Sequence, residues 1–257
     1  MLAIGPVLSA QINTEAMRKG ELTPGLHPAL DIDVGVVAGN SRLLRMNGTL
    51  RFDYLKGADH TFLVIGRQLG ETDSLFMNKG FVHLRRTQSL HGGILVEGFM
   101  QKEFNQFLRL KDRNLAGGGL RIRWLGGAAD EKGKPLIRLL TGLGFMWEQE
   151  LIRNAKAPED TLKNLLRSTN YLVLGWEPDE RLLLQVSTYF QPDITRLFDF
   201  RVLLDGGLTF ALTGKLSVAI KMNARYDNDP PTVVENGVEK SLKKYDVELT
   251  TGLAYVL

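Results

Sequence analysis

Apolar and polar residues alternate with a period of two through most of this chain, and no other feature constrains its fold as strongly. Within residues 216–226, Val218 and Ile220 belong to an apolar row. Lys221 and Arg225 belong to the opposite, polar row. Alternation of this kind is typical of β-strands whose two faces meet different environments. We therefore predict an all-β fold.

The length and number of the alternating stretches predict a barrel. Turn signals such as Gly39-Asn40 separate one stretch from the next. A tilted strand needs about 9 to 11 residues to cross a bilayer. Most stretches have this length or are somewhat longer. We expect a single antiparallel up-and-down transmembrane β-barrel of about twelve strands. Residues 151–163 and 227–244 are expected to be long connections.

Alternation alone does not show which environment the apolar rows meet. In a membrane barrel they face lipid, whereas in a soluble periplasmic β-sandwich that serves as a binding module they form the core. The predicted strands are longer than the about 5 to 6 residues usual in soluble sheets, which favours the barrel. Aromatic residues near the ends of the apolar rows also favour it, because such residues form interfacial girdles. They are Tyr54, Trp124, Trp147, Trp176, Phe190, Tyr226 and Tyr255.

Composition excludes several classes of protein. The 257 residues include no cysteine, so neither a disulfide framework nor a thiolate metal site can form. No stretch approaches about 18 consecutive apolar residues, which excludes a helical membrane protein. The formal net charge is +3, but lysine and arginine are scattered and form no basic run. A nucleic acid is therefore not an expected partner.

Two short segments are expected to precede the barrel. Residues 1–10 contain an apolar run that ends in Leu8-Ser9-Ala10, a small-residue pattern typical of a secretory cleavage site. We interpret them as a truncated signal peptide, with an ordinary N-terminus as the alternative. Residues 11–29 are polar and aperiodic, which predicts a periplasmic lead-in. Residues 30–257 then form the predicted outer membrane β-barrel domain.

The stretch TTGLAYVL, residues 250–257, also favours an outer membrane barrel. Leu253, Tyr255 and Leu257 share one row. This pattern resembles the C-terminal signal of bacterial outer membrane proteins, although Leu257 replaces the more usual terminal aromatic residue. We expect this strand to pair with the first strand, because a bare strand would expose unpaired backbone groups.

Two hairpins carry a resemblance to a known family. Residues 216–231 and 244–255, separated by a variable loop, resemble the closing hairpin of the YdiY-like salt-induced outer membrane proteins, the domain of unknown function 481. Residues 31–41, with the Gly39-Asn40 turn, resemble its opening hairpin. The resemblance covers residues 30–257 and implies a β-barrel in the bacterial outer membrane. It supplies no catalytic residues.

The residue types that carry catalysis or bind metals are few and poorly placed. The four histidines have no metal-ligand spacing with one another or with a carboxylate. Ser89 and His91 are close in sequence but match no nucleophile motif. Gly117-Gly118-Gly119 lacks the spacing of a phosphate loop, so a crowded or curved strand is its expected role. We therefore expect no enzymatic activity, no metal ion and no cofactor.

The polar rows are expected to line the lumen of the barrel. Buried charges must be paired or hydrated, so the lumen is either closed by ion pairs or a narrow, charge-selective channel. The basic excess favours small anionic solutes as partners of a channel, and a role as an envelope-stress component is the alternative. Outer membrane lipid, lipopolysaccharide and the barrel assembly machinery are the other expected partners. The residues expected to face the lumen are Arg45, Arg51, Asp53, Arg138, Asp199, Arg201, Lys221, Arg225, Asp246 and Glu248.

Overall fold

The computed structural model describes most of the chain, and the described residues form fourteen β-strands. The described residues are 23–37, 43–71, 75–106, 109–125, 136–153, 160–179, 181–213, 216–230, 232–235, 238–241 and 243–255. The strands are β1 (Gly25–Val37), β2 (Leu43–Lys56), β3 (Asp59–Glu71), β4 (Leu75–His91), β5 (Ile94–Asn105), β6 (Leu110–Leu125), β7 (Leu136–Ile152), β8 (Thr161–Asp179), β9 (Leu182–Pro192), β10 (Phe200–Ala211), β11 (Leu216–Asp227), β12 (Thr232–Glu235), β13 (Val238–Ser241) and β14 (Tyr245–Tyr255).

Twelve of these strands form one antiparallel sheet. Its order is β1 to β11 and then β14, so each strand pairs with the strand that precedes or follows it in the chain. β12 and β13 form a separate two-stranded sheet within the connection between β11 and β14. The predicted all-β, up-and-down arrangement of about twelve strands is confirmed. Among the described residues, no helix is long and apolar enough to span a membrane.

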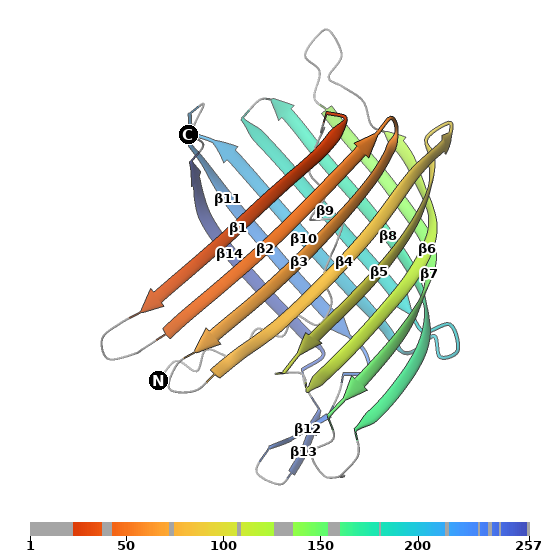
Figure 1. Cartoon of the computed structure of the whole chain (residues 1–257), viewed down its shortest axis with the longest axis vertical. Helices are drawn as coiled ribbons and strands as arrows, with labels where there is room; N and C mark the ends of the chain where they lie inside the picture. Colours follow the sequence, from red (N-terminus) through yellow and green to blue (C-terminus); the bar gives the residue numbers. More distant parts are fainter. Residues whose placement is uncertain are drawn as a thin grey trace.

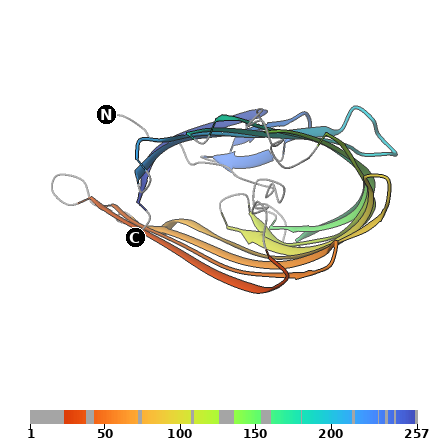
Figure 2. The same cartoon turned by 90° about the horizontal axis from the view of Figure 1, so that it is seen from above.

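The sheet curls into a flattened ring around a lumen. Figure 1 shows the strands tilted relative to the ring axis, and Figure 2 shows the ring from above. The two edge strands, β1 and β14, lie on the same side of the ring (Figure 2). The ladder expected between the last strand and the first is absent from the described residues, so the sheet is curled without being closed. Local alternation predicts strands but does not specify a register between strands at opposite ends of the chain.

The two ends of the ring differ in the length of their connections. At the short-turn end, two residues join β2 to β3, β4 to β5 and β8 to β9, and four join β10 to β11, whereas the β6–β7 connection has ten residues. At the long-loop end, the β7–β8, β9–β10 and β11–β14 connections have eight, seven and seventeen residues. Residues 151–163 and 227–244, predicted as long connections, both belong largely to the long-loop end.

The described residues place the N-terminal boundary earlier than expected. β1 begins at Gly25, within the segment 11–29 predicted as a lead-in. Leu26 and Leu30 are exposed on the same face of β1, but Pro28 between them obscures the alternation. The predicted signal segment, residues 1–10, and the terminal residues 256–257 lie outside the described residues.

The strands point their apolar faces outward and their polar faces into the lumen. Leu84 and Phe145 are exposed on the outside of the wall, whereas Arg85 and Glu148 are buried on the inside. A β-sandwich would instead bury its apolar rows between two packed sheets. Twelve of the described strands form one curled sheet with an apolar exterior, which is the arrangement of a transmembrane barrel.

Glycines let β5, β6 and β7 pack closely where the ring bends sharply (Figure 2). A Cβ atom added to Gly119 would lie 2.2 Å from the carbonyl oxygen of Leu143 and 2.6 Å from the Cα of Gly144. Gly119 and Gly144 are directly opposite each other in the ladder. Only a residue without a side chain fits this approach. The Gly117-Gly118-Gly119 run therefore belongs to a crowded strand, as the sequence predicts.

Aromatic residues gather near both ends of the outer wall. Trp124 and Trp176 are exposed near the short-turn end. Phe190, Phe200 and Tyr226 form a row near the long-loop end, with neighbouring ring centroids 5.7 and 5.8 Å apart. Two such rows, with an apolar wall between them, match the interfacial girdles of membrane barrels.

Candidate functional site

Glu148 is the centre of a buried ion-pair network at the long-loop end of the lumen. Its carboxylate accepts hydrogen bonds of 2.8 Å from Arg167 and from Arg201. Arg113 Nε lies 2.8 Å from the same carboxylate. All four side chains are almost completely buried. A buried carboxylate is stable only when paired in this way, because its hydration has been lost.

Further carboxylates balance the three arginines. Arg225 extends the group, since it donates to Asp227 at 2.6 Å. The other pairs are Arg113 with Glu103 at 2.6 Å and with Glu150, Arg167 with Asp199 at 2.9 Å, and Arg201 with Asp227 at 3.2 Å and with Glu150 at 3.3 Å. We call the whole group the lumen network; it comprises Glu103, Arg113, Glu148, Glu150, Arg167, Asp199, Arg201, Arg225 and Asp227.

The lumen network crosses from one part of the wall to another. Arg201 lies on β10 and Glu148 on β7, so two strands separate them in the sheet. Neighbouring strands are about 4.8 Å apart, which places the two backbones about 14 Å apart along the wall. Their side chains meet because the wall curves around the lumen. Ion pairs therefore bridge the long-loop end of the lumen.

A second bridge lies closer to the short-turn end. Tyr171 on β8 donates a hydrogen bond of 2.7 Å to Glu97 on β5. Arg121 on β6 donates to the Tyr171 hydroxyl at 3.2 Å. Arg85 on β4 lies 3.5 Å from Glu97. Side chains thus connect strands β4 to β8 across the inside of the curve, in addition to the backbone ladders.

Apolar side chains fill the lumen beside these bridges. Phe62, Met146 and Leu203 belong to inward rows and are almost completely buried. Tyr171, Val173, Tyr189 and Leu203 pack together in one cluster. A partly open space of about 290 Å³, open solvent included, remains in this region, lined by residues from seven strands including His83 and Gln191. The lumen along β4 to β10 is therefore largely filled by its own side chains.

The lumen along β11 is less filled. Lys221 and Asn223 belong to the same inward row as the buried Asp227, yet both side chains are exposed. A Cβ atom added to Gly207, which pairs with Lys221, would meet nothing within 4 Å. Free space therefore remains along this part of the wall.

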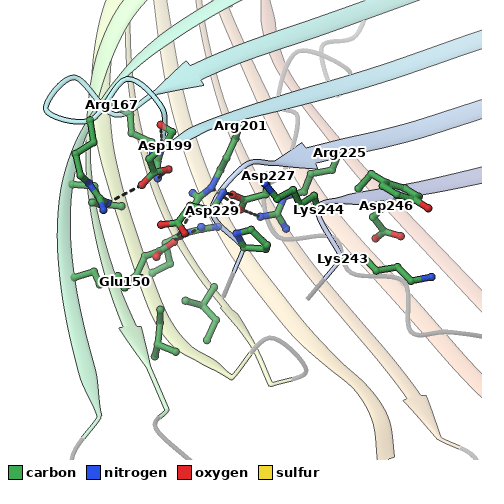
Figure 3. A pocket seen from close by; sticks show the side chains of 18 residues that line it. Glu150, Arg167, Asp199, Arg201, Arg225, Asp227, Asp229, Lys243, Lys244 and Asp246 are labelled. Carbon is green, nitrogen blue, oxygen red and sulfur yellow. Dashed lines mark hydrogen bonds and ion pairs between the residues drawn. The ribbon is translucent and has the colours of Figure 1, made fainter. Parts of the chain in front are cut away.

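A charged recess of about 800 Å³, open to solvent, lies at the long-loop end (Figure 3). Arg201 and Asp227 of the lumen network form one part of it, and Lys243, Lys244 and Asp246 form another. In Figure 3, Lys243 and Asp246 lie apart from the ion-paired group around Arg201. The recess thus combines paired charges with charges that remain available to a solute.

Comparison with known proteins places this architecture in a family. Residues 34–257 match the family model described as protein of unknown function, DUF481. The chain belongs to the DUF481 family. This result confirms the resemblance carried by the two hairpins, and the matched residues include the whole lumen network.

One solved structure is similar to this DUF481 member. It is described as the NanC porin in a rhombohedral crystal form, and the TM-score is 0.48 at 13% sequence identity. The similarity covers 89% of this chain and 100% of that chain. No curated protein matches the chain.

The ten residues predicted to face the lumen fall into two groups. Four are buried and ion-paired: Arg51, Asp53, Asp199 and Arg201. Asp53 accepts a 2.6 Å hydrogen bond from Arg51 and lies 2.8 Å from His60, near the short-turn end. The other six are not fully buried and lie on inward rows: Arg45, Arg138, Lys221, Arg225, Asp246 and Glu248. Arg138 pairs with Glu177 at 3.0 Å.

The ten predicted residues omit much of the lumen network. Glu150 follows Glu148 by two residues, and Asp227 follows Arg225 by two, so extending the alternation to the strand ends would have included both. No spacing in the sequence connects Arg113 or Arg167 with a carboxylate, because their partners lie on other strands. The other two network residues absent from the ten are Glu103 and Glu148.

The arrangement is suited to holding and selecting charges. In the described part of the chain, no three histidine or acidic side chains are placed to hold a metal ion. His83 Nδ1 lies 2.9 Å from Gln101, and His60 contacts Asp53. Paired charges cross the lumen, and further charges surround a solvent-filled recess at one end.

Proposed function

We propose that this DUF481 protein is a bacterial outer membrane β-barrel that forms a narrow passage for small anionic solutes. The observation that carries the proposal is the ion-paired network across the lumen, beside a recess that Lys163 and Lys243 line without an ion pair among the described residues. We assign the protein a transport role without an enzymatic step.

The outer surface supports the membrane placement. An apolar wall between two aromatic rows suits a bilayer and its two interfaces. Outer membrane barrels have short periplasmic turns and longer extracellular loops, so the long-loop end would face the cell exterior. Lipid and lipopolysaccharide would surround this wall. Insertion would depend on the barrel assembly machinery.

The lumen supports a narrow passage. The bridges and the apolar cluster fill the lumen along β4 to β10, whereas free space follows β11. Twelve strands also give a barrel between the small barrels that side chains fill and the 16- to 18-stranded porins with open channels. A passage along one wall would discriminate strongly by size and charge.

The recess supports a preference for anions. Eight basic and five acidic side chains line it, and Glu103, Glu148 and Asp193 pair with three of its arginines from outside the lining. Within the described residues, Lys163 and Lys243 form no ion pair, so both remain available to a solute. A cleft lined by an excess of one sign raises the local concentration of the opposite ion.

The test is conductance in planar lipid bilayers under a potassium chloride gradient. We expect small single channels whose reversal potential shows anion preference. The double variant Lys163→Gln/Lys243→Gln should shift that potential toward cations. Lys102→Gln is the matched control, because Lys102 is exposed and belongs to the outward row of β5. It should leave the potential unchanged.

The second candidate is an envelope-stress component whose lumen is blocked by its own side chains. The buried side chains that fill the lumen along β4 to β10 favour it. A correctly folded protein that inserts but conducts no ions would support this candidate over the passage. Folding is checked by a band on SDS gels that shifts on boiling and is found in the outer membrane fraction. Recovery in the soluble fraction without such a shift would contradict both candidates.

A further inference from the structure

The connection between β9 and β10 presents an exposed apolar tip. Phe198 is 89% exposed and Leu197 is 68% exposed, and Ile194 in the same connection is also exposed. No other large apolar side chain among the described residues is as exposed as Phe198. In water, such a group of side chains on a seven-residue connection would be unfavourable.

This connection has a defined conformation. Asp193 accepts hydrogen bonds from the backbone and hydroxyl of Thr195, at 2.8 and 2.7 Å. The backbone N–H of Asp193 donates to the carbonyl of Asp199 at 2.8 Å, which closes the base of the connection. Asn228 donates to the carbonyl of Phe198 at 2.6 Å. The apolar tip is therefore held in place by its polar base.

The connection also lies at the level of the apolar wall. The backbone N–H of Ile194 donates to the carbonyl of Leu166 on β8 at 2.9 Å. Leu162, which is exposed on the same face of β8, lies nearer than Leu166 to the long-loop end of that strand. Trp147, also exposed, is opposite Leu166 in the ladder. The outward row of β8 thus carries an apolar side chain beyond the point where the connection attaches, with the polar Asn164 between Leu162 and Leu166.

The tip projects away from the lumen. Figures 1 and 2 both show the β9–β10 connection standing out from the outer side of the ring. Phe198 precedes Phe200, which belongs to the aromatic row with Phe190 and Tyr226. The tip is therefore continuous with the aromatic row near the long-loop end.

We propose that the β9–β10 connection is a lipid anchor that inserts Leu197 and Phe198 into the outer leaflet beside the barrel. The partner is the acyl-chain and headgroup boundary of the bilayer, where aromatic and aliphatic tips of rigid segments bury their apolar surface. This inference rests on the proposed membrane placement. It goes beyond that placement, because it assigns a membrane contact to a connecting segment outside the barrel wall.

Site-directed spin labelling tests the anchor directly. The chain has no cysteine, so each single-cysteine variant carries one label. The variants are Phe198→Cys, Leu172→Cys as the lipid-exposed reference on β8, and Lys243→Cys as the water-exposed reference. Phe198 makes little packing contact, so its replacement should not impair folding. The band that shifts on boiling verifies this for all three proteins.

The measurement is the collision rate of each label with oxygen and with a water-soluble nickel chelate. The protein is reconstituted in vesicles of phosphatidylcholine and phosphatidylglycerol. We expect the label at position 198 to collide preferentially with oxygen, as at position 172, and the label at position 243 to collide preferentially with nickel.

Two outcomes would overturn the inference, and they are distinguishable. A label at position 198 that behaves like position 243, while position 172 reports lipid, would show a membrane barrel whose tip lies in water. The exposed apolar tip would then be available to bind a protein partner. A label at position 172 that reports water would overturn the membrane placement and the anchor together.

Discussion

Arg201 Nη1 on β10 lies 2.8 Å from Glu148 Oε1 on β7, although two strands separate them in the sheet. This contact fixes the distance between two parts of the wall that the backbone ladders connect only indirectly. Arg201 also contacts Glu150 and Asp227, so one guanidinium joins three strands. We therefore expect the lumen network both to brace the curled sheet and to narrow the lumen.

Removal of the charge on Glu148 should destabilise the folded protein. In Glu148→Gln, Arg167 and Arg201 lose their shared carboxylate inside the lumen. Breaking a buried ion pair by removing one partner costs about 3–5 kcal/mol. The temperature at which the folded band converts to the unfolded band on gels should fall clearly.

An exposed ion pair provides the control for this change. Arg86 lies 3.2 Å from Asp59, but its side chain is largely exposed. Surface ion pairs contribute about 0–1 kcal/mol, so Arg86→Gln should leave the conversion temperature nearly unchanged. Equal effects of the two substitutions would show that the lumen network does not brace the barrel.

Shortening the crossing side chain should widen the passage. Arg201→Ser removes the guanidinium that joins β10 to β7, and single-channel conductance should rise severalfold. Arg86→Ser is the control, because Arg86 is exposed on the outward row of β4 and pairs with Asp59 there. Unchanged conductance in folded Arg201→Ser would place the constriction elsewhere.

A side chain added at Gly119 should prevent close packing of β6 and β7. The new methyl group of Gly119→Ala would meet the carbonyl oxygen of Leu143 at 2.2 Å, and backbone atoms cannot move away cheaply. We expect destabilisation of about 1–3 kcal/mol, read from urea-induced unfolding in detergent. Gly48→Ala should be harmless, because nothing lies within 4 Å of the added atom. Equal stability of both variants would contradict the close packing of β6 against β7 at Gly119.

A positive charge on the outer wall should block membrane assembly. Ile220→Arg places a guanidinium on the outward row of β11, where a charge near the midplane costs about 2–4 kcal/mol. Asn223→Arg places the same group on the inward row, where the side chain is exposed to the lumen. The folded outer membrane band should be lost only for Ile220→Arg. Assembly of both variants would mean that the outer wall does not meet lipid.

Several features of the site could be predicted from local pattern alone. Alternation places Arg51, Asp53 and Arg201 on inward rows because side chains in a strand point to opposite faces in turn. The same rule places Ile220 on the outward row. Pro28 shows where alternation fails as a guide. It lies between Leu26 and Leu30 on one face of β1, so the start of this strand was not predicted.

The amino-acid sequence by itself determined the all-β class, the approximate number of strands and which residues share a face, because these depend on residues two positions apart. Only the tertiary structure decided that the apolar rows face outward, that Arg201 meets Glu148, that Gly119 meets Gly144 and that Phe198 is exposed. These contacts depend on how strongly the sheet curves and how its strands are staggered. Curvature and stagger arise from the packing of all twelve strands together, so no local spacing encodes them.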